Sequence, residues 1–291
     1  MLEGVIVKGI GGFYYVKTDE GLIECRARGV FREEKITPLV GDKVKIKISE
    51  EDGSGYVVDI KERKTQLLRP PVANVTQAIL VMSVKNPDIN SWLLDKFLLM
   101  SEYQGLEVIV CINKYDLDPS LSEKYQEIYN KAGYNALLTS CKLDVGIDKL
   151  RKLLDNNISV FAGPSGAGKS SLLNKVDGRL NLETGTVSYK TKRGKHTTRH
   201  TELLELNDRS YILDTPGFSS LDLDFIEQEN HVKEYFREIR KFGAECRFLT
   251  CLHDKEPNCA VKEKAQEGII NEERYKNYLL LLNEVRNIRR Y

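Results

Sequence analysis

The most informative segment of the chain is Gly163-Pro164-Ser165-Gly166-Ala167-Gly168-Lys169-Ser170, which matches GxxxxGK[ST] in full. It follows an apolar run at 158–162 and precedes a helical pattern that starts at Ser171. Glycines allow consecutive backbone N–H groups to converge on an anion, and the helix adds the positive end of its dipole. The pattern therefore predicts a strand, a phosphate-binding loop and a helix, with residues 163–171 around the phosphates.

Two residues of this loop have specific expected roles. Lys169 would neutralise the β- and γ-phosphates, and the Ser170 hydroxyl would ligate the Mg²⁺ that accompanies the nucleotide. The alternative is a glycine-rich turn without a ligand. That alternative gives no reason for the strand and helix on either side of the motif.

Two segments that lie earlier in the chain predict that the base of the bound nucleotide is guanine. The NKxD match, Asn113-Lys114-Tyr115-Asp116, follows an apolar run at 108–112. The Asp116 carboxylate can accept from both guanine N1–H and N2–H₂, a donor pair that adenine lacks. A second segment, Thr139-Ser140-Cys141-Lys142, is similar to the loop that covers guanine in GTPases. An ordinary turn at a strand end is the alternative for this second segment, and an ATPase is the alternative for the whole site.

Two further segments are expected at the γ-phosphate. Asp214-Thr215-Pro216-Gly217 fits DxxG, in which Asp214 meets Mg²⁺ through water and Gly217 offers its N–H to the γ-phosphate. Residues 187–200 carry five cations, two histidines and no acid, where a nucleotide-sensing loop would lie. Thr197 or Thr198 could complete the Mg²⁺ shell. A solvated basic loop without a sensing role is the alternative.

Patterns on either side of this region predict a protein of three domains. Residues 1–66 alternate apolar and polar positions between glycine turns, which predicts a small antiparallel β-barrel with an OB-fold; an SH3-like or purely structural barrel is the alternative. Residues 67–222 alternate strands and helices, which predicts an α/β domain with a mostly parallel sheet. Residues 223–291 are charged and helical except for a cysteine cluster.

The cysteine cluster has the donor set of a structural zinc site. Cys246, Cys251, His253 and Cys259 follow the spacing C-x4-C-x-H-x5-C. Three thiolates and one imidazole suit tetrahedral Zn²⁺, and a full set of four ligands leaves no open position for catalysis. Disulfide pairing is the alternative, but it would leave one thiol over and is disfavoured in a reducing cytosol.

Composition excludes several classes of protein. With 41% hydrophobic and 30% charged residues the chain is expected to fold as a globular protein rather than stay disordered. Its apolar runs are too short to span a membrane, and a net charge of +1 excludes a uniformly basic nucleic-acid binder. The N-terminal residues lack the pattern of a secretory signal, so we expect a cytoplasmic protein without membrane partners.

The order of the motifs is unusual. Ordinary GTPases run from the phosphate loop through the switch threonine and DxxG to NKxD, whereas here NKYD and TSCK come first. A circular permutation explains this order, because each motif still follows the end of its own strand. With a barrel before it and a cysteine cluster after it, the chain resembles the RsgA (YjeQ/YloQ) family of bacterial GTPases, which act in assembly of the small ribosomal subunit.

The resemblance implies roles that the residues alone do not. Where Ras-like enzymes have a water-orienting glutamine, this chain has Phe218. The family pattern implies that His196, in Lys195-His196-Thr197, positions the attacking water instead; a structural or RNA-facing histidine is the alternative. It also implies a bound Zn²⁺ at the cluster, GTP and GDP as ligands, a monomer, and the small subunit with its rRNA as partner. The competing hypothesis is a zinc-dependent RNA-binding module whose nucleotide site is only structural.

Overall fold

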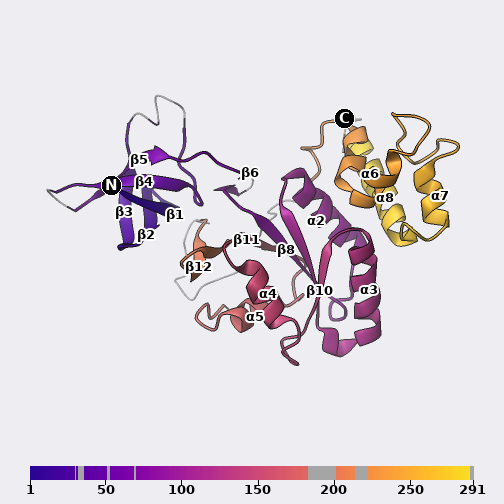
Figure 1. The fold of residues 1–291 in the computed structure, drawn as a ribbon, viewed down its shortest axis with the longest axis horizontal. Helices are drawn as coiled ribbons and strands as arrows, with labels where there is room; N and C mark the ends of the chain where they lie inside the picture. The colour runs from indigo at the N-terminus through magenta and orange to yellow at the C-terminus, as the bar shows by residue number, and fades with distance from the viewer. Residues whose placement is uncertain are drawn as a thin grey trace.

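The computed structural model describes residues 1–29, 31, 36–50, 53–68, 70–182, 201–213 and 222–288. In this part of the chain it has a barrel, a central α/β domain and a helical C-terminal domain (Figure 1). Several predicted site residues lie outside the described residues, namely His196, Thr197, Thr198, Asp214 and Gly217. Their roles therefore stay predictions.

The N-terminal barrel confirms the predicted fold of this region. Its strands close in the order β1-β2-β3-β5-β4, and β1 completes the ring by pairing antiparallel with β4. Alternation explains the closure, because Val44 and Ile46 of β4 are fully buried while Lys43 and Lys47 are exposed. Five strands in this closed order form an OB-type barrel; their bounds are Leu2–Ile10, Phe13–Thr18, Gly21–Ala27, Lys43–Ile48 and Gly55–Ile60.

A short ribbon connects the barrel with the central domain. Strands β6 (Gln66–Leu68) and β7 (Pro71–Ala73) pair antiparallel with each other. Val72 also forms a bridge with Val40, next to the barrel. The predicted domain boundary at 66/67 falls inside β6 and stays a prediction.

The central sheet has the strand order β10-β9-β8-β11-β13-β12. All neighbours pair parallel except β12 and β13, which form an antiparallel hairpin at one edge. Fully buried apolar strands of this kind need cover on both faces. The strands span Gln77–Ser83 (β8), Glu107–Asn113 (β9), Asn135–Thr139 (β10), Ile158–Ala162 (β11), Leu203–Asn207 (β12) and Ser210–Leu213 (β13).

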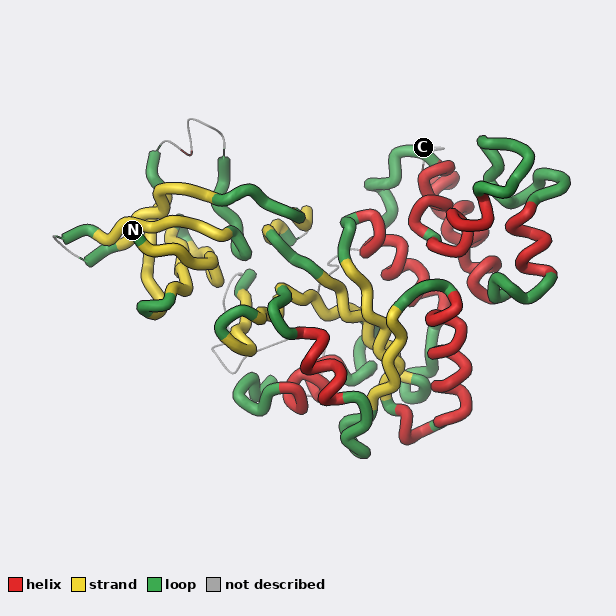
Figure 2. Tube along the Cα trace, in the orientation of Figure 1, coloured by secondary structure: helices red, strands yellow, loops and turns green. Residues whose placement is uncertain are grey.

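Helices cover the two faces of the sheet (Figure 2). Alternate residues of β8 belong to two different cores, Leu80 to the one that contains α2 and α3 and Ile79 to the one that contains α4 and α5. Asn90 caps α2, because its side chain accepts from the Leu93 N–H. The helices span Ser91–Tyr103 (α2), Pro119–Lys131 (α3), Ile147–Leu154 (α4) and Lys169–Val176 (α5), with a 3₁₀ turn η1 at Tyr115–Leu117.

The C-terminal domain packs against α2 around one buried arginine. Arg274 is 1% exposed and forms ion pairs with Asp95 of α2 and Glu238 of α6. Asp95 also accepts hydrogen bonds from Tyr129 at 3.0 Å and from Asn277 at 2.7 Å. The domain comprises η2 (Glu229–Tyr235), α6 (Arg237–Gly243), α7 (Ala260–Gln266) and α8 (Glu272–Ile288).

Candidate nucleotide site and metal centre

The phosphate loop connects β11 with α5, as predicted. Its backbone favours glycine at three places, because Gly163, Gly166 and Gly168 have φ of 140°, 77° and 95°. A Cβ atom at Gly163 would lie 2.0 Å from the Val81 carbonyl oxygen, so the loop passes directly against β8. Ser165 and Gly166 are exposed at the tip, whereas Ala167 is buried beneath it. The exposed backbone N–H groups of such a tip suit a phosphate.

Lys169 begins α5 and folds back over the loop. Its Nζ donates to the carbonyl oxygens of Gly163 and Pro164, both at 2.9 Å. Partial burial lowers the pKa of Lys169 from its usual value. An anion beside the ammonium group would oppose that shift, so the loop as built favours a negatively charged ligand. Ser170 and Ser171 follow in the first turn of α5, half-buried.

Asn113 joins the two predicted halves of the site. It ends β9, is 2% exposed, and its amide donates to the Ala167 carbonyl oxygen of the phosphate loop at 2.8 Å. Its side-chain oxygen Oδ1 accepts from the Thr139 hydroxyl of β10 at 3.0 Å. Gly168 leaves room for this side chain, since a Cβ atom there would lie 2.3 Å from Asn113 Nδ2. One buried amide thus connects three segments that are far apart in the sequence.

The residues predicted to recognise the base lie together beside Asn113. The Ser140 hydroxyl donates to Asp116 Oδ1 at 2.6 Å and also accepts from the Leu143 N–H at 3.2 Å. These bonds fix one carboxylate oxygen of Asp116 while its side chain stays partly exposed in η1. Cys141 is partly exposed and Lys142 is fully on the surface. The structure therefore brings NKYD and TSCK together next to the phosphate loop.

Sequence reasoning missed the loop that follows β8. Lys114 adopts a left-handed conformation, with φ of 59°, and its Nζ donates to the Asn86 carbonyl oxygen. Burial lowers the pKa of Lys114, while the nearby Asp116 carboxylate opposes that shift. A Cβ atom at Gly166 would lie 3.4 Å from Pro87 Cδ. Because β8 lies between β9 and β11 in the sheet, the loop at its carboxyl end lies between NKYD and the phosphate loop. The position of β8 in the sheet was the signal that could have identified this loop.

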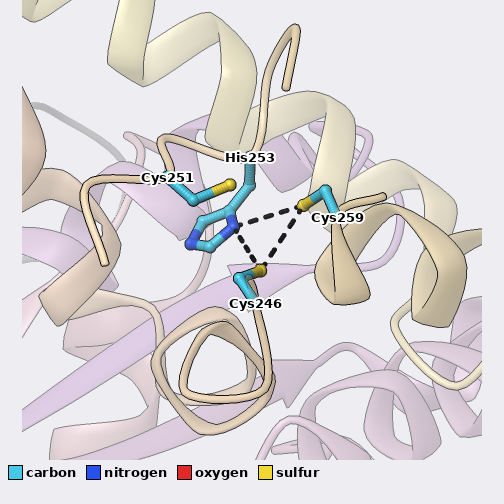
Figure 3. Close-up of side chains that lie close together, drawn as sticks. All are labelled: Cys246, Cys251, His253 and Cys259. Carbon is cyan, nitrogen blue, oxygen red and sulfur yellow. Dashed lines mark hydrogen bonds between the residues drawn. The ribbon is translucent and has the colours of Figure 1, made fainter. Parts of the chain in front are cut away.

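The four predicted metal ligands also come together (Figure 3). Their donor atoms all lie within 4.8 Å of one another. Cys246 Sγ is 3.5 Å from His253 Nδ1 and 3.7 Å from Cys259 Sγ, and His253 Nδ1 is 3.4 Å from Cys259 Sγ. Tetrahedral zinc with ordinary bond lengths separates its ligand atoms by about 3.5–3.8 Å. The three atoms Cys246 Sγ, His253 Nδ1 and Cys259 Sγ therefore have nearly the separations of a tetrahedral zinc site, and Cys251 Sγ lies within 4.8 Å of them as the fourth possible ligand.

The chemistry of the cluster supports the same conclusion. Burial lowers the pKa of His253 to about 4, so the imidazole is neutral, as metal binding requires. Burial raises the pKa of Cys251 and of Cys259, so their thiolates need a nearby cation. Within the described ranges His253 Nε2 has no hydrogen-bond partner. It packs instead against Gly243, where a Cβ atom would lie 3.0 Å away.

Residues of α8 hold in place the loop that carries the predicted metal ligands. Tyr275 donates to the His253 carbonyl oxygen and Tyr278 to the Leu252 carbonyl oxygen, both at 2.6 Å. Glu256 accepts from the backbone N–H groups of Leu252 and Asp254, at 2.8 and 3.0 Å. The conformation of the loop is therefore set by Glu256 within it and by two tyrosines of α8.

Among the described residues, no helix is both long and apolar enough to cross a membrane.

Comparisons with known proteins agree with this architecture. A family model described as RsgA GTPase matches residues 60–224, and one described as RsgA N-terminal domain matches residues 3–57. Small ribosomal subunit biogenesis GTPase RsgA of Clostridium perfringens is 50% identical over 289 residues, which is 99% of each chain. The Clostridium beijerinckii protein of the same name is 50% identical over 285 residues, 98% of this chain and 97% of its own.

Solved structures match over nearly the whole length. The crystal structure of YloQ, a circularly permuted GTPase, is 38% identical and has a TM-score of 0.83 over 99% of this chain and 96% of its own. YjeQ from Thermotoga maritima has the same identity and TM-score over 97% and 98%. Domain order, strand order and the full-length identity all lead to one assignment: this chain belongs to the RsgA GTPase family.

Proposed function

We propose that this protein binds GTP in the site between β8, β9, β10 and β11, hydrolyses it to GDP and phosphate, and acts in maturation of the small ribosomal subunit. The observation that carries the proposal is the Asn113 junction. Its two hydrogen bonds hold the phosphate loop and the guanine-recognition segments against each other, although the permuted chain supplies them in reverse order. A glycine-rich turn without a ligand would not need that junction.

Each part of the site has a distinct role in this proposal. Asp116 accepts from the guanine, and Ser140, Cys141 and Lys142 cover the base. Residues 163–171 surround the phosphates, with the Lys169 ammonium exchanging its two carbonyl partners for phosphate oxygens. Mg²⁺ bound with the nucleotide would neutralise charge that develops on the phosphates, held by the Ser170 hydroxyl and by residues outside the described ranges.

Hydrolysis needs a group that orients water. Phe218 stands where Ras-like enzymes have glutamine, and its side chain can neither donate nor accept a hydrogen bond. We infer that His196 takes this role, with Asp214, Gly217 and one of Thr197 and Thr198 completing the γ-phosphate site. Such an arrangement predicts slow turnover alone and faster turnover when a partner orders the loop around His196.

The partner proposal rests on the relatives and on the flanking domains. The most similar curated proteins described above are named for small ribosomal subunit biogenesis. An OB-type barrel commonly binds oligonucleotides, and the cysteine cluster is proposed to hold one structural Zn²⁺. We infer that a monomer in the cytoplasm contacts rRNA with these domains when GTP is bound and leaves after hydrolysis.

The decisive experiment is GTP hydrolysis with and without purified small subunits. We expect slow turnover alone and clear stimulation by small subunits but not by large ones. Tighter association of small subunits with protein carrying a GTP analogue than with protein carrying GDP is the second expected result. Absence of turnover in both conditions would support the competing RNA-binding hypothesis, and competition by ATP as strong as by GTP would overturn the guanine assignment.

A further inference from the structure

The barrel contacts the sheet of the central domain at one edge strand. Lys8 of β1 forms an isolated antiparallel bridge with Glu202, immediately before β12, and its Nζ lies 2.9 Å from Glu202 Oε2. Lys17 of β2 forms a second ion pair, 2.9 Å from Glu205 Oε2 within β12. In Figure 1, β12 lies on the side of the central domain that faces the barrel. Two adjacent barrel strands therefore hold one edge strand.

This contact depends on charge. A cleft of about 470 Å³ lies between the barrel and the β12–β13 hairpin, and its lining includes Lys43, Asp208 and Arg209. The Lys8 and Glu202 side chains are 23% and 35% exposed, so the contact is partly wet. A polar contact of this kind can be weakened by reversing a charge without opening a hydrophobic core.

The two predicted γ-phosphate segments are connected in sequence to the same end of the β12–β13 hairpin. Leu203 of β12 pairs with Leu213 of β13, the residue that precedes Asp214 in the sequence. Ahead of β12, the sequence runs back to the basic segment at 187–200. Strand β13 also pairs parallel with β11, which ends at the phosphate loop. Both predicted γ-phosphate segments are therefore attached to a hairpin that the barrel holds.

We propose that Lys8 and Lys17 are positioning residues for GTP turnover. By fixing the β12–β13 hairpin they set where the chain enters and leaves the γ-phosphate site, so that a ligand bound to the barrel can change the turnover rate. This inference rests on the proposed GTPase function and deepens it. It assigns the barrel a role in turnover in addition to RNA contact.

Charge reversal and charge exchange test the proposal in the full-length protein. Lys8→Glu should lower kcat for GTP by roughly three- to tenfold, because it replaces an ion pair with a repulsion. KM and GDP affinity should stay within about twofold, since Asp116 and Lys169 are untouched. Combining Lys8→Glu with Glu202→Lys should restore most of kcat. The matched control is Lys45→Glu, which breaks the Lys45–Asp59 pair within the barrel and should leave kcat unchanged.

Hydrogen exchange supplies a readout that does not depend on turnover. With GDP bound, Lys8→Glu should increase hydrogen exchange at residues 203–213. The double variant that combines Lys8→Glu with Glu202→Lys should restore protection there. Equal kcat in wild type, Lys8→Glu and the control would overturn the positioning role while leaving the GTPase function intact. A fall in kcat that the exchanged pair does not restore would also overturn it. A wild-type protein without any turnover would overturn the proposed function, and this inference with it.

Discussion

At the scale of single residues, the site depends on side chains that serve two segments at once. Asn113 bonds both the phosphate loop and β10, and Ser140 bonds both Asp116 and the turn that follows it. Both side chains are short; Asn113 ends β9 and Ser140 directly follows β10. Short side chains at strand ends lose little conformational freedom, so they hold their partners accurately.

Asp116→Asn should change the preferred base. An amide offers one acceptor and one donor in place of two acceptor oxygens. It therefore loses a charge-assisted bond to guanine, and its NH₂ group faces one of the two guanine donors. We expect GDP affinity to fall roughly a hundredfold, equivalent to about 3 kcal/mol. Xanthosine diphosphate, which has a carbonyl oxygen in place of the guanine amino group, should bind better than GDP. Titration with fluorescent nucleotides measures both, with the exposed Asp148→Asn as control.

His196→Ala should separate binding from turnover. If His196 orients water, the variant keeps GTP and GDP affinity within about twofold and loses roughly 10- to 100-fold in kcat. The neighbouring His200→Ala provides the matched control, because it removes an imidazole from the same basic segment. Single-turnover hydrolysis measured with small subunits present is the appropriate assay. Equal rates for His196→Ala and wild type would remove the assignment.

At the scale of elements, the loop that carries the predicted metal ligands shows how a segment without regular secondary structure acquires a fixed shape. The Cys246–Cys259 segment is held by α8 through two tyrosine hydroxyls and by its own Glu256. Three of the four ligand side chains are buried and Cys246 is partly exposed, and one metal ion would join all four across this segment. Binding of the metal ion would therefore contribute to the folding free energy of this domain.

Cys259→Ser should remove the metal and loosen this domain. We expect zinc content to fall from one ion per chain to well below half, because a serine hydroxyl is a poor ligand for zinc. Thermal unfolding should then begin earlier, whereas GDP affinity changes little. Elemental analysis and calorimetry measure these two effects. Cys141→Ser, which alters a partly exposed thiol outside the cluster, should retain full zinc content.

At the scale of the whole molecule, the C-terminal domain is attached to the central domain by a buried ion network. Arg274 lies between Asp95 and Glu238, and its guanidinium stacks on the rings of Tyr129 and Phe236. The chain enters this domain after DxxG, but its main contact is with α2. The loop that precedes α2 contains Asn86, which bonds Lys114 in the nucleotide site.

Arg274→Met should destabilise the protein strongly. Removing the arginine leaves two buried carboxylates without a cation, which costs about 3–5 kcal/mol in the free energy of unfolding. Burial already raises the pKa of Asp95 to about 6 beside the arginine. Without the arginine that pKa rises further, and the folded state takes up protons that the unfolded state does not. The difference from wild type should therefore shrink as pH falls from 7 to 5.

Urea unfolding at both pH values checks this prediction. Lys131→Met, which breaks an exposed ion pair with Glu127, should cost less than about 0.5 kcal/mol at either pH. A cost for Arg274→Met that is equally small would contradict the network as the main link between the two domains. A cost that grows toward pH 5 would contradict the direction of the pKa shift.

Local sequence was sufficient to predict the elements and to predict which of the described motifs lie together. Each motif is contiguous and follows an apolar strand, and parallel strands present their carboxyl ends at one edge of the sheet. That rule places NKYD, TSCK and the phosphate loop together whatever their order in the chain. The predicted metal ligands are likewise close in sequence, so their clustering and their donor set of three thiols and one imidazole predicted a shared ion.

Contacts between distant segments could not be obtained in this way. Nothing near Asn86, Lys8 or Arg274 in the sequence indicates its partner, because those partners lie 28, 194 and 179 residues away. An ion pair or a bond to a backbone carbonyl has no sequence spacing of its own. Its geometry is set by how whole domains pack, and that packing depends on the sum of many contacts along the chain.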